Sequence, residues 1–128
     1  MRSRRIRLRE FNEAQQYPFC EICNRQVRSG DFDQEINILR SNRGDILLVC
    51  HSGCDPKEFF TVDRMKNSSA LLYGMDFIVD GQSFRCINFP AGGRAQLIND
   101  SGRVVERELN ELSMDIDGEV VRISNTTS

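Results

Sequence analysis

The spacing of the cysteines constrains the fold of this 128-residue chain more than any other feature of the sequence. Cys20 and Cys23 form a C-x-x-C pair, and Cys50, His51 and Cys54 follow after 26 intervening residues. A C-x-x-C turn brings two thiolates to one ion, and a second pair at the end of a strand supplies the other two ligands of a tetrahedral zinc site. We therefore predict one structural Zn²⁺ per chain. Five cysteines, an odd number, do not fit a closed set of disulfides.

The fourth ligand stays open between two neighbouring residues. His51 lies at x2 spacing from Cys54, the commoner arrangement, and Cys50 lies at x3 spacing. The commoner spacing favours His51, so the expected set of ligands is Cys20, Cys23, His51 and Cys54. The affinity of zinc for thiolate favours Cys50, which stays the alternative to His51. Cys86 lies alone in a strand pattern and is expected to be a core residue.

The first half of the chain is expected to contain an arm and a small module. Residues 1–16 are polar and predict a basic arm with a short helix at 9–16. Strands are expected at 36–40 and 46–50, joined by a turn of Ser, Asn, Arg, Gly and Asp into a hairpin. A helix is expected from Asp55, as its N-cap, to about residue 66. The module would span 17–67.

Residues 68–128 contain short strand patterns separated by turns. Asp80-Gly81 is the strongest hairpin signal, and a polar tail follows Ser124. Short strands can bury a common face by curling into a small barrel, so a five-stranded barrel is expected here. The chain as a whole is then α+β with mostly β content. Seven segments have a strand pattern, of which roughly five would build the barrel: 70–73, 76–79, 83–89 (closed by a turn at 90–93), 94–98, 103–108, 113–116 and 119–123.

Residues 17–66 resemble the treble-clef zinc fingers. The resemblance rests on the knuckle Cys-Glu-Ile-Cys at 20–23, a hairpin, and ligands that open a helix at His51 and Cys54. Within that group, Ile-Leu-Leu-Val-Cys-His-Ser-Gly-Cys-Asp-Pro-Lys at 46–57 looks like the end of an HNH-type domain. HNH nucleases need a histidine general base between the two cysteine pairs, and residues 24–49 contain none. The resemblance therefore implies a structural finger, and we expect no enzymatic activity.

The second half of the chain is similar in rhythm to SH3-like and tudor-like small barrels. The segments that carry this similarity are Phe-Ile-Val-Asp-Gly-Gln-Ser-Phe-Arg at 77–85, Ala-Gln-Leu-Ile at 95–98 and Asp-Ser-Gly-Arg-Val-Val at 100–105. Such modules bind protein or nucleic acid more often than they catalyse. No binding residue carries over from the similarity.

Charge is distributed unevenly along the chain. Residues 1–67 hold twelve Lys and Arg against ten Asp and Glu, and residues 68–128 hold five against nine. Guanidinium groups pair well with phosphate oxygens, so the basic arm indicates contact with DNA or RNA. The first hypothesis is therefore a zinc-binding regulator or accessory protein that contacts nucleic acid through the arm and the finger. The arginines of this arm are Arg2, Arg4, Arg5, Arg7 and Arg9.

A second hypothesis comes from the acidic remainder of the chain. With its arm set aside the chain carries a net charge of −7, which favours an adaptor or inhibitor that docks on a larger protein through the acidic barrel. No apolar run has the ~18 residues of a membrane span, and no secretory signal follows the N-terminal arginines. The sequence thus predicts a cytoplasmic protein, and it indicates no small-molecule substrate.

Overall fold

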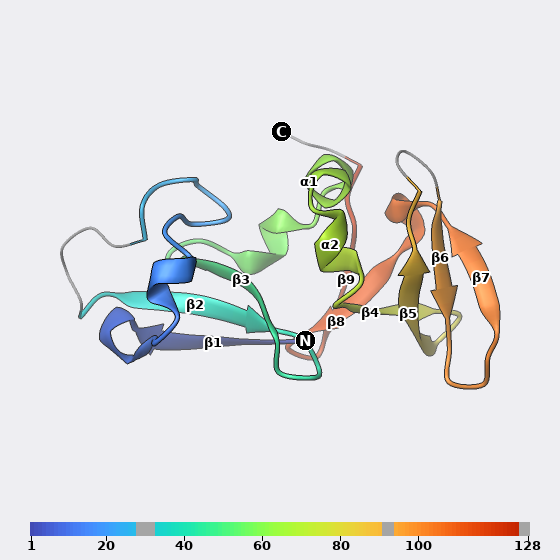
Figure 1. Cartoon of the computed structure of the whole chain (residues 1–128), viewed down its shortest axis with the longest axis horizontal. Coiled ribbons are helices and arrows are strands. Elements are labelled where there is room, and N and C mark those ends of the chain that lie inside the picture. Colours follow the sequence, from blue (N-terminus) through green and yellow to red (C-terminus); the bar gives the residue numbers. More distant parts are fainter. Residues whose placement is uncertain (28–32, 91–93, 126–128) are drawn as a thin grey trace. The chain divides into compact units, whose positions relative to one another are not determined.

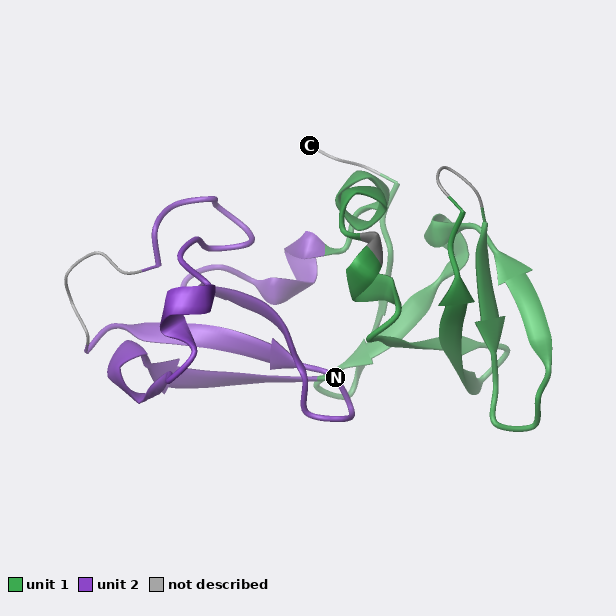
Figure 2. Cartoon of the chain, viewed as in Figure 1, with its two compact units in different colours: residues 1, 60–128 green, residues 2–59 purple. Residues whose placement is uncertain are grey.

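The computed structural model describes residues 1–27, 33–90 and 94–125 and divides into two compact units (Figure 2). Residues 2–59 form the N-terminal unit, and residues 60–128 together with Met1 form the C-terminal unit. Within the described ranges, no helix has both the length and the apolar character to cross a bilayer. The turn expected at 90–93 and the tail after Ser124 lie partly outside the described residues.

A three-stranded antiparallel sheet organises the N-terminal unit (Figure 1). Its order is β1 (Arg2–Arg7), β2 (Glu35–Arg40) and β3 (Ile46–His51). The predicted hairpin is confirmed, since β2 pairs with β3 around the expected turn. The Ser41 hydroxyl stabilises this turn by accepting hydrogen bonds from the N–H groups of Arg43 and Asp45, at 3.2 and 3.1 Å.

The prediction of an arm at the N-terminus is wrong, because residues 2–7 form strand β1. Ile6 lies opposite Ile36 of β2, and Arg2 lies opposite Arg40. Isoleucine and leucine at positions 6 and 8 give the segment the period of two that a half-buried strand requires. The stretch 9–16, where one short helix is expected, does not form a continuous helix. Two 3₁₀ turns, η1 (Leu8–Glu10) and η2 (Ala14–Gln16), occupy that stretch.

The core of the N-terminal unit lies between its sheet and the segment that follows β1. Ile6 and Tyr17 pack against this core from its margin. The cluster therefore ties the strands to the turn that carries the first cysteine pair. Its buried members are Leu8, Phe11, Cys20, Val27, Ile36, Ile38, Val49 and Cys50.

The helix expected at 55–66 is interrupted. Pro56–Phe59 form a 3₁₀ turn, η3, and the α-helix α1 spans Val62–Asn67. Between them Thr61 is extended and bridges Ser124 in parallel, and the Ser124 N–H donates to the Phe60 carbonyl at 3.0 Å. The boundary between the two compact units lies after Phe59. Thr61 is the N-cap of α1, because its hydroxyl accepts a hydrogen bond from the Arg64 N–H.

A six-stranded antiparallel sheet forms the C-terminal unit, in the order β7-β6-β5-β4-β8-β9. The segment expected as a strand at 70–73 is instead mostly helix α2 (Ser69–Leu72). The other expected strands are confirmed, but in the described residues the sheet does not close into a barrel, and β7 and β9 are its edges. The strands are β4 (Asp76–Val79), β5 (Gln82–Asn88), β6 (Ala95–Ile98), β7 (Val104–Arg107), β8 (Ser113–Ile116) and β9 (Glu119–Arg122).

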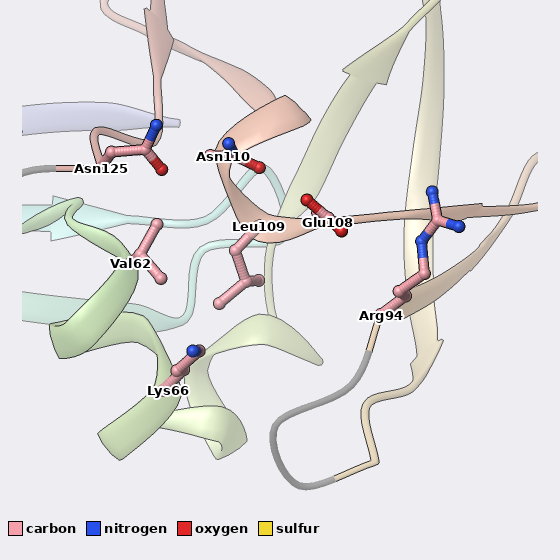
Figure 3. A pocket seen from close by; sticks show the side chains of 7 residues that line it. All are labelled: Val62, Lys66, Arg94, Glu108, Leu109, Asn110 and Asn125. Atoms are coloured by element: carbon pink, nitrogen blue, oxygen red, sulfur yellow. The ribbon is translucent and has the colours of Figure 1, made fainter.

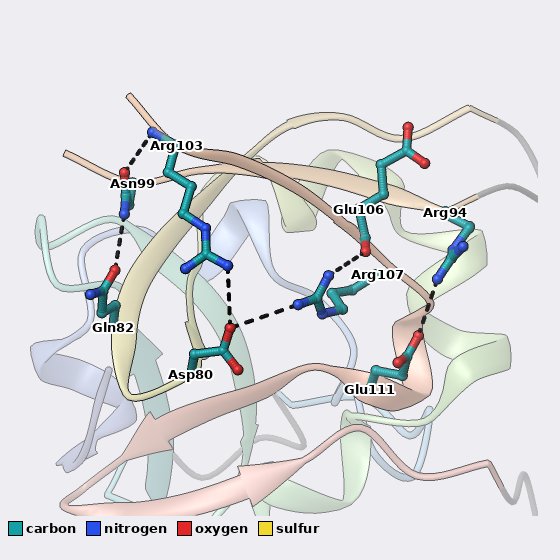
Figure 4. A network of polar contacts seen from close by, with 8 residues as sticks. All are labelled: Asp80, Gln82, Arg94, Asn99, Arg103, Glu106, Arg107 and Glu111. Atoms are coloured by element: carbon teal, nitrogen blue, oxygen red, sulfur yellow. Dashed lines mark hydrogen bonds and ion pairs between the residues drawn. The ribbon is translucent and has the colours of Figure 1, made fainter. Parts of the chain in front are cut away.

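Polar contacts show how strongly this sheet curls. Asp80, in the turn after β4, forms ion pairs with Arg103 at 3.6 Å and with Arg107 of β7 at 3.8 Å (Figure 4). Strands β5 and β6 separate β4 from β7 in the order of the sheet, so only a curled sheet brings these charges together. The inner face holds fully buried Phe77, Phe84 and Leu97, and Cys86 is buried as expected.

The attachment of β1 can be tested by stability measurements. Ile6→Ala should lower the free energy of unfolding of the N-terminal unit by about 1–2 kcal/mol, below the 2–5 kcal/mol of a fully buried isoleucine, because Ile6 is only half-buried. Arg4→Ala, on the exposed surface of the same strand, should change it by no more than about 0.5 kcal/mol. Denaturant unfolding measures both variants. If Ile6→Ala and the unmodified protein were equally stable, residues 2–7 would not be packed on the sheet as strand β1.

Candidate metal centre

Four side chains with metal-binding atoms converge in the N-terminal unit. The ligand atoms of Cys20, Cys23, His51 and Cys54 all lie within 4.8 Å of one another. The Sγ atoms of Cys20 and Cys54 are 3.8 Å apart, and the Cys23 Sγ lies 3.3 Å from the His51 Nδ1. This cluster could hold one metal ion.

A tight turn presents the first two cysteines. Its stem is an antiparallel bridge between Phe19 and Gln26, supported by a hydrogen bond from the Cys20 N–H to the Arg25 carbonyl at 2.8 Å. Asn24 closes the turn in the left-handed region, with φ of 61°, which asparagine tolerates better than most residues. The turn aims two backbone N–H groups, those of Ile22 and Cys23, at the Cys20 Sγ, at 3.4 and 3.5 Å.

The β2–β3 hairpin delivers the other two ligands. His51 is the last residue of β3, and a turn closed by the Cys54 N–H and the His51 carbonyl, at 3.0 Å, returns Cys54 to the cluster. Side chains alternate along a strand, so His51 and Cys50 point in different directions, and the Cys50 sulfur is not among the clustered ligand atoms. His51 is the residue that joins the cluster. The buried Cys50 thiol contacts the Cys54 carbonyl at 3.7 Å instead.

A backbone carbonyl orients the imidazole of His51. The Nε2 atom lies 3.0 Å from the Gln26 carbonyl oxygen, which can only accept a hydrogen bond, so Nε2 carries the proton and Nδ1 is free to bind a metal. Metal-bound histidines commonly donate their other N–H in this way. Sequence reasoning missed Gln26, because any residue type provides the same carbonyl.

The thiols of the cluster differ in their electrostatic surroundings. Burial raises the pKa of Cys20, but hydrogen bonds from the backbone of Cys23, His51 and Ile22 outweigh it and lower that pKa to about 6. Burial and the adjacent Cys20 sulfur raise the pKa of Cys54 to about 11. Burial and nearby negative charge raise the pKa of Cys50 to about 12, so its thiol stays protonated. The cluster therefore places negative charge where a cation would compensate it.

The arginines predicted to bind phosphate lie on and just after β1. Arg5 pairs with Glu35 at 3.7 Å, and Arg9 pairs with Asp33 at 2.7 Å. The remaining three are exposed and form no ion pair with another described residue. Alternation along the strand puts Arg5 on the opposite face from Arg2 and Arg4. These arginines thus form an exposed basic edge; its three unpaired members are Arg2, Arg4 and Arg7.

The comparison with known proteins identifies no relative of this chain. No protein-family model matches this sequence, and neither a curated protein nor a solved structure matches it.

The choice between the two candidate fourth ligands can be measured by elemental analysis. His51→Ala should lose most of the bound metal, since it removes one of four ligands, whereas Cys50→Ala should keep one equivalent, because the Cys50 sulfur is not among the four clustered ligand atoms. Cys23→Ser should behave like His51→Ala. A His51→Ala protein that retains one equivalent of metal while Cys50→Ala loses it would reverse the assignment.

Proposed function

We propose that this chain is a non-enzymatic zinc-binding regulator or accessory protein that contacts nucleic acid through the basic edge and the finger. The observation that supports zinc is the cluster of three cysteines and one histidine. Three sulfur ligands and one imidazole suit Zn²⁺, which prefers four such ligands at tetrahedral angles. Hard cations such as Mg²⁺ and Ca²⁺ prefer oxygen ligands instead.

The separations within the cluster support a tetrahedral ion. Bonds of about 2.3 Å to sulfur and about 2.0 Å to nitrogen at tetrahedral angles separate two sulfurs by about 3.8 Å and a sulfur from a nitrogen by about 3.5 Å. The corresponding distances here are 3.8 Å between Cys20 and Cys54 and 3.3 Å between Cys23 and His51. Two of the six separations therefore match a tetrahedral ion, and all six lie within 4.8 Å. The order of knuckle, hairpin and short helical turn also supports a treble-clef finger.

A structural role for the zinc follows from the number of protein ligands. Catalytic zinc sites keep one position for water or substrate, whereas four protein ligands close the coordination shell. His51, the only histidine of the chain, would be bound to the metal and could not act as a general base.

We expect purified protein with Mg²⁺ or Mn²⁺ to leave single-stranded and duplex DNA uncut in a gel assay. Cleavage that disappears in His51→Ala would contradict this expectation.

Nucleic-acid binding is supported by the unpaired arginines of the basic edge. Guanidinium groups without a carboxylate partner are available to pair with phosphate oxygens. The N-terminal unit also holds ten Lys and Arg against nine Asp and Glu, while the rest of the chain holds seven against ten. Phosphate contact is therefore expected at the N-terminal unit.

The salt dependence of binding measures how many arginines contact phosphate. Each neutralised phosphate contributes about −0.9 to the slope of log K against log[salt] for duplex DNA and about −0.7 for single strands. The three unpaired arginines should therefore give a slope of roughly −2 to −3. Replacing Arg2, Arg4 and Arg7 together by Gln should remove most of it, as fluorescence anisotropy with a labelled 20-mer would show.

A matched control separates local contact from total charge. Arg4→Gln and Arg85→Gln each remove one exposed positive charge, but Arg85 lies on β5 of the C-terminal unit. Only Arg4→Gln should reduce the slope, by about one phosphate contact. Equal loss from both variants, or no binding of the unmodified protein at ~50 mM salt, would refute the assignment to the basic edge.

A further inference from the structure

The C-terminal unit contains a cavity of about 300 Å³ beside helix α1 (Figure 3). Its walls come from α1, from the residue before β6, from the 3₁₀ turn η4 (Leu109–Glu111) and its flank, and from the segment after β9. This volume lies at the lower end of the range for ligand-binding pockets. Sequence reasoning missed the cavity, because four separate segments build it.

Two apolar side chains, Val62 and Leu109, line the cavity among polar and charged ones. Leu109 is 4% exposed, and Val62 of α1 is half-buried beside it. Lys66 lies four residues after Val62 and so projects from the same side of α1. A ligand in this cavity would bury an apolar group against Val62 and Leu109 while a charged group meets Lys66.

The polar and charged side chains around the cavity differ in whether they have a hydrogen-bond or ion-pair partner. The Glu111 carboxylate accepts a hydrogen bond from the Glu108 N–H at 3.0 Å and pairs with Arg94 at 3.6 Å. By contrast, the side chains of Lys66, Asn110 and Asn125 form no hydrogen bond or ion pair with another described residue. One ammonium and two amides therefore remain available at the rim, next to the Glu108 carboxylate.

We propose that this cavity binds the C-terminal end of a partner protein whose last residue is aliphatic. The terminal carboxylate pairs with Lys66, the aliphatic side chain packs on Val62 and Leu109, and the last peptide group meets the rim amides. Charge complementarity supports this occupant, because the Lys66 ammonium has no carboxylate partner among the described residues and lies beside Val62 and Leu109. The volume admits about one residue.

The exposure of the rim favours a chain end over a free metabolite. Lys66, Glu108 and Asn125 are exposed, so a bound residue would remain open to solvent on one side. The rest of a polypeptide can continue outward through that side. This inference does not depend on nucleic-acid binding by the N-terminal unit, and it gives the acidic C-terminal unit a partner class of its own.

The test compares three probes by methyl NMR of the full-length protein. Acetyl-Ala-Ala-Leu with a free carboxylate should shift the methyl signals of Val62 and Leu109 in a saturable manner. Its C-terminal amide should bind at least tenfold more weakly, because Lys66 loses its counter-charge. N-acetyl-leucine carries the same carboxylate, side chain and last peptide group, so its affinity should be close to that of the tripeptide.

Two variants localise the site. Lys66→Gln should weaken tripeptide binding at least fivefold, whereas Arg85→Gln, which removes an exposed charge elsewhere in the same unit, should leave it unchanged. Thermal melting of both variants checks that they fold. The proposal is overturned if the acid and the amide bind equally, if N-acetyl-leucine does not bind, if both variants bind alike, or if millimolar tripeptide shifts neither methyl signal.

Discussion

Thiolates that lie close together repel one another. The N-terminal unit places three cysteine sulfurs and one imidazole nitrogen within 4.8 Å of one another. Two pieces of backbone hold this arrangement. The knuckle fixes Cys20 and Cys23 by hydrogen bonds from its own N–H groups, and the hairpin carries His51 and Cys54 across to it. Cys20 belongs to the hydrophobic cluster as well, so the packing of the sheet and the geometry of the ligands depend on each other.

Much of the cluster of three cysteines and one histidine could be predicted from spacing alone. The C-x-x-C pair and the later group at 50–54 identify the segments that meet, because few other arrangements bring two such pairs together. Spacing could not choose between Cys50 and His51. That choice depends on the register of β3, since a shift of one residue exchanges the two faces of a strand. The hydrogen bond to the Gln26 carbonyl likewise depends on tertiary structure.

The misassigned elements have a common cause in pairing between distant segments. Residues 2–7 are rich in arginine and resemble a free arm, yet they become a strand because β2 offers an unpaired edge. Their charges also suit an edge position, where they discourage pairing with further chains. The helix expected at 55–66 breaks where Thr61 bridges Ser124, a contact across more than sixty residues that no local pattern reveals. Hairpins with Asp-Gly turns, by contrast, were predictable because both turn residues adopt positive φ.

The division of the chain into units has a consequence for the entropy of folding. Met1 and Phe60 both belong to the C-terminal unit, so the 58 residues between them form a loop whose two ends that unit holds. Confining the ends of a loop of this length costs about 4 kcal/mol, and the cost grows only slowly with length. Once the C-terminal unit has folded, that loss has already occurred. The N-terminal unit then folds as an inserted loop with restricted ends, and fewer unfolded conformations compete with the native one.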